Sequence, residues 1–185
     1  MNYANAGAGL RKLFIAQIGS VVCSVLLVIP LINLAGAIGA LVFLILSLIG
    51  LNEAGKDIEG CKKAFQFTIV QLVLTVVSIF TGSGILDTLV SAAVIITGFL
   101  STYFVCSSVA AVLRTCSHDD IATKGELVWK INLICYAARI LVSLLSRIPL
   151  LNILAFPASI VVPIASLIAG ILFIVFLYNS SEVLQ

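Results

Sequence analysis

Four polar residues recur every three or four positions within the apolar stretch 129–147: Asn132, Tyr136, Arg139 and Ser143. This spacing places their side chains on one face of a helix. The stretch is about long enough to cross the hydrocarbon core of a bilayer, where a central arginine costs roughly 2.5–3.5 kcal/mol. We therefore expect Arg139 to face the protein interior or a watery cavity and to have a partner there.

Two interpretations of Arg139 follow from its chemistry. As a binding residue it would hold an anion, with Tyr136 and Ser143 as further donors on the same helix face. As a structural residue it would tie its helix to backbone carbonyls or to the amides of Gln17 and Gln71 on neighbouring helices. The sequence leaves both interpretations open.

The composition sets the environment in which these residues act. Hydrophobic residues make up 62% of the chain and charged residues 10%, whereas soluble domains have about 45–50% and about 25%. The chain is therefore expected to be an all-α integral membrane protein that contacts the lipid bilayer, in the inner or plasma membrane of a prokaryote. The net charge is +2 and the basic residues are not clustered, which excludes a nucleic-acid partner.

Six apolar runs predict a polytopic bundle of six transmembrane helices. Short turns without charge join them in pairs, so the runs form three antiparallel hairpins within one membrane domain. The runs cover residues 13–31, 37–51, 65–80, 86–113, 127–148 and 153–178, and the hairpin units cover about 12–62, 63–128 and 129–185.

Two details of these runs are further expectations. The first eleven residues are small and polar and are interpreted as a short tail or an interfacial segment. Pro157 and Pro163 should kink or break the sixth helix, because each removes a backbone donor and clashes with the preceding turn.

The positions of the basic residues predict the orientation. Eight of them fall in the N-terminal segment and in the two polar loops, whereas the opposite side has only Arg147. By the positive-inside rule, both termini are then cytoplasmic. The eight residues are Arg11, Lys12, Lys56, Lys62, Lys63, Arg114, Lys124 and Lys130.

An internal repeat is a further prediction. The segment IPLIN at 29–33 recurs as IPLLN at 148–152. When the alignment of these two segments is extended back into the helices, Gln17 aligns with Tyr136. A second alignment of the helices pairs Gln17 with Gln71. Three two-helix units that point the same way would form a pseudo-three-fold parallel repeat about the membrane normal.

Asp87 and the segment around His118 have competing interpretations. Asp87 could pair with Arg139 or Arg147, but an N-cap of the fourth helix is favoured. His118 lies beside Cys116 and two aspartates, yet the spacing fits no known metal site, so a solvated loop in which Ser117 caps the next helix is favoured. We predict no metal and no cofactor.

The motifs of hydrolases, metalloproteases and nucleotide-binding enzymes do not occur in the sequence, so we do not expect an enzyme. We predict a protein that binds or transports a small solute, possibly anionic, or the substrate-binding subunit of a transporter. Its size and span count resemble those of the substrate-binding components of energy-coupling-factor vitamin transporters, with no shared motif. The predicted site residues are Arg139, Tyr136, Ser143, Asn132, Gln17 and Gln71.

The alternative is a scaffold that does not transport and that binds lipid, another membrane protein or a second copy of itself. Small residues four positions apart, as at Ala35 and Gly39 or at Ala165 and Ala169, would allow such close helix contact.

Overall fold

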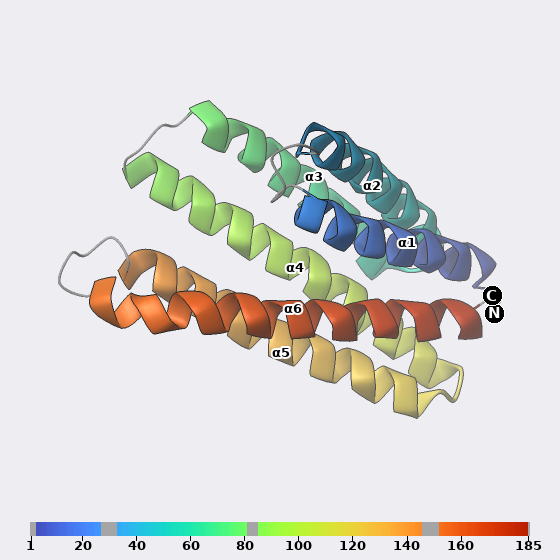
Figure 1. The fold of residues 1–185 in the computed structure, drawn as a ribbon. Coiled ribbons are helices and arrows are strands. Elements are labelled where there is room, and N and C mark those ends of the chain that lie inside the picture. Colours follow the sequence, from blue (N-terminus) through green and yellow to red (C-terminus); the bar gives the residue numbers. More distant parts are fainter. Residues whose placement is uncertain (1–2, 27–32, 81–84, 146–151, 185) are drawn as a thin grey trace.

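The computed structural model describes residues 3–26, 33–80, 85–145 and 152–184; the side chains of residues 33, 79, 85, 143–145 and 152–160 are outside this description. The described part is all-α, which confirms the predicted fold class (Figure 1). Its six helices are α1 (Ala4–Leu26), α2 (Asn33–Ala54), α3 (Glu59–Phe80), α4 (Ile85–Thr115), α5 (Asp119–Leu145) and α6 (Asn152–Val183).

Five of these helices are long and apolar enough to cross a bilayer: α1, α2, α3, α4 and α6. The chain is therefore an integral membrane protein, since in lipid a helix satisfies its own backbone polar groups. Over its described residues α5 does not pass the same test of length and composition. It begins with two aspartates and also carries Lys130 and Arg139.

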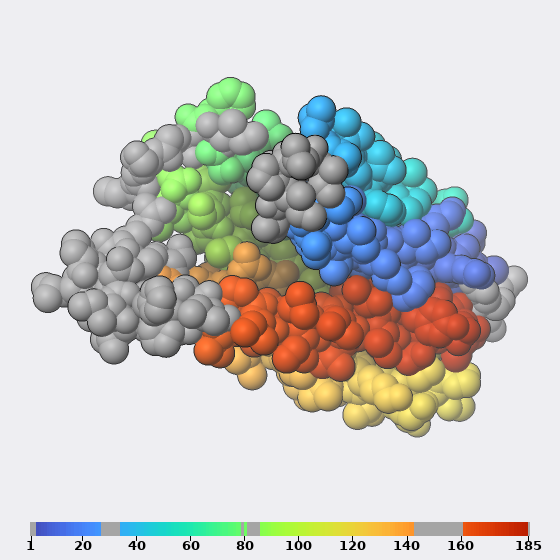
Figure 2. All heavy atoms as spheres, in the orientation of Figure 1, coloured from blue at the N-terminus to red at the C-terminus, as the bar shows by residue number. Residues whose placement is uncertain are grey.

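The helices form a closed ring. Each packs against the next in the chain, and α6 returns to pack against α1. The closest pairs are α1 with α2 and α3 with α4, and α2 meets α3 least. Figure 2 shows α1 and α6 side by side on one face, where the two ends of the chain close the ring. This order leaves a centre that all six helices surround.

The tightest packing lies at the end of the bundle that holds both termini (Figure 1). At Gly9 an added Cβ would lie 2.4 Å from the Ala54 nitrogen and 2.5 Å from the Gly50 oxygen, so the backbones of α1 and α2 are in contact. The turns between α2 and α3 and between α4 and α5 are at the same end. Its largest fully buried side chains include Leu10, Val105, Val109, Leu113, Phe176 and Leu177.

The predicted N-terminal tail is wrong, because α1 begins at Ala4 and its residues Ala6 and Leu10 are buried. Asp57, from the turn between α2 and α3, accepts hydrogen bonds from the Ala6 backbone nitrogen at 2.9 Å and from Asn5 Nδ2 at 3.0 Å. A carboxylate at this position satisfies a free donor of the first turn and interacts favourably with the helix dipole. The small residues therefore extend a helix that another segment caps.

The sixth helix was predicted to kink or break at its prolines, and the predicted break is wrong. α6 continues from Asn152 to Val183 through both Pro157 and Pro163. A proline removes one backbone hydrogen bond, and the bonds on either side remain. A bilayer favours the continuous helix because interrupted backbone there has no water to bind.

Two capping predictions also change. Ser117 does not cap α5: it has a positive φ of 63° and ends α4 instead. The Ser117 and His118 nitrogens donate to the carbonyls of Arg114 at 3.1 Å and Leu113 at 2.9 Å, the Schellman pattern of a helix C-terminus. Asp87 lies inside the first turn of α4, two residues after its start, so it is not the N-cap.

Candidate functional site

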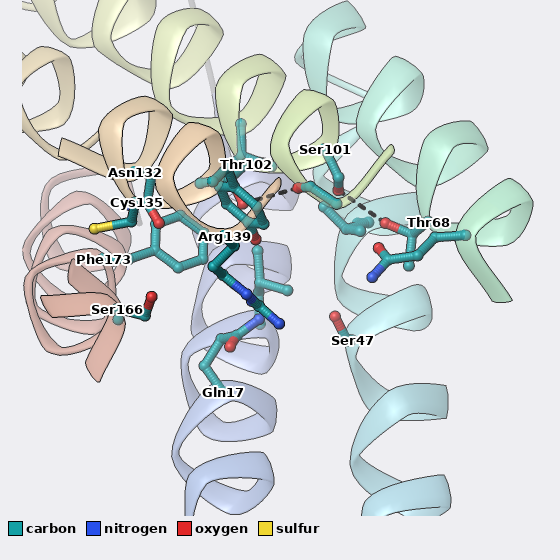
Figure 3. Close-up of a pocket in the computed structure, with 17 residues that line it drawn as sticks. Gln17, Ser47, Thr68, Ser101, Thr102, Asn132, Cys135, Arg139, Ser166 and Phe173 are labelled. Atoms are coloured by element: carbon teal, nitrogen blue, oxygen red, sulfur yellow. Dashed lines mark hydrogen bonds between the residues drawn. The ribbon is translucent and has the colours of Figure 1, made fainter. Parts of the chain in front are cut away.

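A pocket of about 290 Å³ occupies the centre of the ring, and all six helices line it (Figure 3). One end of the pocket is apolar. Four residues there line the pocket and also belong to the buried core: Leu13, Leu51, Val105 and Phe173. The core therefore closes the pocket towards the end that holds the termini. The polar lining residues are Gln17, Ser47, Thr68, Gln71, Ser101, Thr102, Asn132, Tyr136, Arg139 and Ser166.

Five of the six residues predicted from the sequence line this one pocket. Gln17 comes from α1, Gln71 from α3, and Asn132, Tyr136 and Arg139 from α5. The sixth, Ser143, lies on α5, but its side chain is outside the described residues. The polar faces of the three odd-numbered helices thus converge on the same space.

Among the residues that the structure describes, Arg139 is the only charged one that lines the pocket. Its guanidinium makes no ion pair or hydrogen bond with any residue that the structure describes, Asp87, Gln17 and Gln71 included. Its guanidinium carbon lies 5.9 Å from the centroid of the Tyr136 ring, within the range of a cation–π contact. Figure 3 shows Arg139 and Gln17 directed towards each other in the pocket. The predicted clamp to Gln17 or Gln71 is not formed.

Aromatic packing between α4 and α5 fixes the position of Tyr136. Its ring meets Phe99 of α4 edge-on, with the ring centroids 5.9 Å apart. Phe99 in turn lies 6.1 Å from Tyr103, whose ring meets Trp129 edge-on at 5.2 Å. Tyr136 is therefore part of an aromatic row and provides a firm surface beneath Arg139.

Several polar side chains of the lining have their hydrogen bonds satisfied within the protein. Thr68, Thr102 and Asn132 each donate to the carbonyl four positions earlier in their own helix, at 2.9, 3.2 and 2.9 Å. The hydroxyls of Thr68 and Ser101 also bond to each other at 2.8 Å and so join α3 to α4. The threonine and serine hydroxyls have thus used their donors within the protein, whereas Asn132 retains its second N–H and its amide oxygen for a ligand.

A second set of polar side chains has no such partner within the described part of the chain: Gln17, Ser47, Gln71, Arg139 and Ser166. The Ser166 hydroxyl is fully buried and unpartnered. An unsatisfied polar group in a membrane-spanning region costs several kcal/mol. This set therefore requires water or a polar ligand in the pocket.

Sequence reasoning missed the lining residues of the even-numbered helices. The missed residues are single serines in apolar runs: Ser47, Ser101 and Ser166. Because a serine in such a helix commonly donates to a carbonyl of its own helix, its presence does not indicate a pocket. Two glycines also line the pocket. A Cβ at Gly98 would lie 3.2 Å from Gln71 Nε2, whereas a Cβ at Gly170 would meet nothing within 4 Å. Gly98 thus accommodates the Gln71 amide, and Gly170 leaves open space.

The predicted polar loop shows no metal site. Within the described residues, no three His, Cys, Asp or Glu side chains are grouped as a metal ion would require. The five cysteines are free thiols, and all but Cys116 are buried.

Comparisons of the chain with known protein families, curated proteins and solved structures gave no match. The chemistry of the pocket is therefore the basis for assigning a function.

Proposed function

We propose that this protein binds a small anionic solute in the central pocket, as a transporter or as the substrate-binding subunit of one. The observation that carries the proposal is the Arg139 guanidinium, which is unpaired in a pocket whose other described lining residues are uncharged. A cation in such a setting attracts an anion strongly, because the surrounding helices and lipid screen its charge little.

The unpartnered donors indicate which kind of anion fits. Gln17, Gln71 and Ser166 come from three different helices and can donate hydrogen bonds to a ligand held by Arg139. A guanidinium binds carboxylate or phosphate oxygens in pairs, so either group suits the site. The part of the pocket lining that the structure describes contains no Asp, Glu or His. We therefore propose binding and not catalysis.

We propose six membrane spans with both termini in the cytoplasm. α5 lies between α4 and α6 in the ring, and its 27 residues extend about 40 Å, which is enough to cross the bilayer with them. Its charged residues lie in its first half, up to Lys130, apart from Arg139, which faces the pocket. The basic residues of the two polar loops and the N-terminal segment support the cytoplasmic side for the termini.

The pseudo-three-fold repeat remains part of the proposal. Gln17, Gln71 and Tyr136 are the three positions that the sequence alignment equates, and all three line the pocket. This agreement supports a common origin of the three hairpins. Only the third hairpin adds a cation, so the repeat would have acquired its anion specificity in α5.

The scaffold alternative has less support. It relied on small residues as contact surfaces for a partner, but two of these pack within the chain. A Cβ at Gly39 would lie 2.6 Å from the sulfur of Cys23, and Ala169 is fully buried, whereas Ala35 is exposed. Gly39 and Ala169 therefore serve the packing of the ring itself.

Thermal shift measurements on the detergent-solubilised protein test the proposal. A panel of small carboxylates and phosphates is added to wild type, Arg139→Gln and Arg139→Lys. An anion at a hundredfold excess over its Kd should stabilise wild type by about 2.7 kcal/mol, or roughly 5–10 °C in Tm. The shift should vanish in Arg139→Gln and persist in part in Arg139→Lys.

Lys130→Gln is the matched control, because it removes a cation from the same helix outside the pocket. It should respond to anions as wild type does. If no member of the panel gives a shift that depends on Arg139, the binding proposal fails.

A further inference from the structure

A second hollow, separate from the central pocket, lies at the seam where α1 meets α6, near the two termini. Its volume is about 250 Å³. Four of its six lining residues are exposed, so it opens to the outside of the ring. The seam is the contact between α1 and α6 in Figure 2. The lining residues are Arg11, Phe14, Ile15, Tyr178, Ser181 and Glu182.

The hollow contains two opposite charges that do not neutralise each other. Arg11 is exposed and forms no ion pair with Glu182 or with any other described residue. The Tyr178 hydroxyl donates to Glu182 Oε1 at 2.6 Å, which orients the carboxylate and leaves its second oxygen free. Phe14 packs against Tyr178 with ring centroids 5.3 Å apart and closes the back of the hollow.

Exposed aliphatic side chains extend from this charged hollow along both helices. On α1, Ile15, Ile18 and Val22 follow Arg11 at helical spacing and are all exposed. On α6, three residues precede Tyr178 at the same helical spacing and are also exposed: Val175, Ile171 and Ile168. Because α1 leads away from the termini and α6 leads towards them, both rows run from the hollow into the membrane.

We propose that this hollow binds one phospholipid with a phosphoethanolamine headgroup. Arg11 pairs with the phosphate and donates hydrogen bonds to its oxygens, and the free oxygen of Glu182 accepts a hydrogen bond from the primary ammonium. An acyl chain lies along the aliphatic rows, and Tyr178 sits at the boundary where tyrosines are enriched.

Charge and hydrogen bonding distinguish this headgroup from the alternatives. A choline ammonium carries no N–H and gives Glu182 no hydrogen bond. An anionic headgroup such as phosphoglycerol would meet Arg11 favourably but would place no cation at Glu182. Of these three headgroups, only phosphoethanolamine brings both a phosphate for Arg11 and an N–H donor for Glu182.

Native mass spectrometry of the delipidated full chain tests this site. The protein is titrated with phosphatidylethanolamine, phosphatidylcholine and phosphatidylglycerol of identical acyl chains. We expect phosphatidylethanolamine to bind wild type about tenfold more tightly than phosphatidylcholine, the worth of one charge-assisted hydrogen bond. Glu182→Gln should reduce its affinity to that of phosphatidylcholine, and Arg11→Gln should weaken both lipids.

Two control variants, Lys56→Gln and Glu59→Gln, each remove one charge of the same sign at the same end of the bundle but outside the hollow. They should leave lipid binding unchanged. Ile15→Trp fills the hollow without changing a charge and should abolish the lipid preference even if a charge variant does not fold. Equal binding of the ethanolamine and choline lipids by wild type overturns the proposal. So does tighter binding of phosphatidylglycerol, or a preference that survives in Glu182→Gln or Ile15→Trp.

Discussion

The guanidinium of Arg139 lies over the ring of Tyr136, one turn earlier on α5, with 5.9 Å between the guanidinium carbon and the ring centroid. Tyr136 is itself packed edge-on against Phe99 of α4. A guanidinium over an aromatic face keeps its N–H donors free at its edge. The ring therefore orients the cation without consuming the hydrogen bonds that a ligand would use.

Replacing Tyr136 tests this relationship. Tyr136→Leu should weaken anion binding about two- to fivefold, because a cation–π contact of this kind contributes about 0.5–1 kcal/mol. Tyr136→Phe retains the aromatic face and should bind more tightly than the leucine variant. Isothermal titration with the best anion from the thermal shift panel measures both. Equal affinities of the two variants would show that the ring does not position Arg139.

Gly170 allows the pocket to be filled without disturbing its walls, because a Cβ there meets nothing within 4 Å. Gly170→Leu should weaken anion binding by roughly tenfold or more, as its side chain takes the space of the ligand. The control is Ile171→Leu, on the exposed face of the same helix. Unchanged binding by Gly170→Leu would mean that the ligand binds elsewhere.

Two glycine-to-alanine changes should have opposite effects on stability. At Gly9 the new Cβ collides with the backbone of α2, so Gly9→Ala should lower the free energy of unfolding by about 1–3 kcal/mol. Gly170→Ala has open space and gains helix propensity, so it should be neutral or stabilising by up to about 1 kcal/mol. Thermal unfolding in detergent compares the two. A Gly9→Ala protein as stable as wild type would contradict the contact between α1 and α2.

Removing the side chain of Ser117 should make the folded protein more stable. The φ of 63° at Ser117 is left-handed, a conformation that costs a side-chain-bearing residue roughly 1–2 kcal/mol and costs glycine little. Ser117→Gly should therefore raise Tm by about 2–4 °C. Ser117→Ala retains the Cβ and should unfold close to wild type. A glycine variant no more stable than the alanine variant would argue against the helix end seen at Ser117.

Much of the fold could be predicted from the sequence because lipid imposes simple rules. Apolar runs of bilayer length, separated by turns and charged loops, predicted the six helices. The errors came from local propensity. Ala4 to Gly9 looked like a tail, yet small residues let α1 contact α2 closely and Asp57 caps its start. The prolines of α6 were weighted too heavily against the bilayer's demand for continuous helix.

The pocket lining was predictable at the residues whose large polar side chains are costly to place in a membrane. Arg139, Tyr136, Asn132, Gln17 and Gln71 were found because large polar groups in apolar runs must face an interior. Ser47, Ser166 and Gly170 were not, because small residues occur in such helices for many reasons. Their roles depend on which helices are neighbours, and helix order within a bundle is a tertiary property that periodicity does not encode.

The seam between α1 and α6 also constrains biosynthesis. Helices enter the membrane in the order in which they are made, and neighbours along the chain can pair as they emerge. The contact of α6 with α1 must wait until every intervening helix has been inserted. Until then the polar faces of α1 and α5 border an open gap, so the nascent chain depends on water, lipid or an insertion factor to shield Gln17 and Arg139.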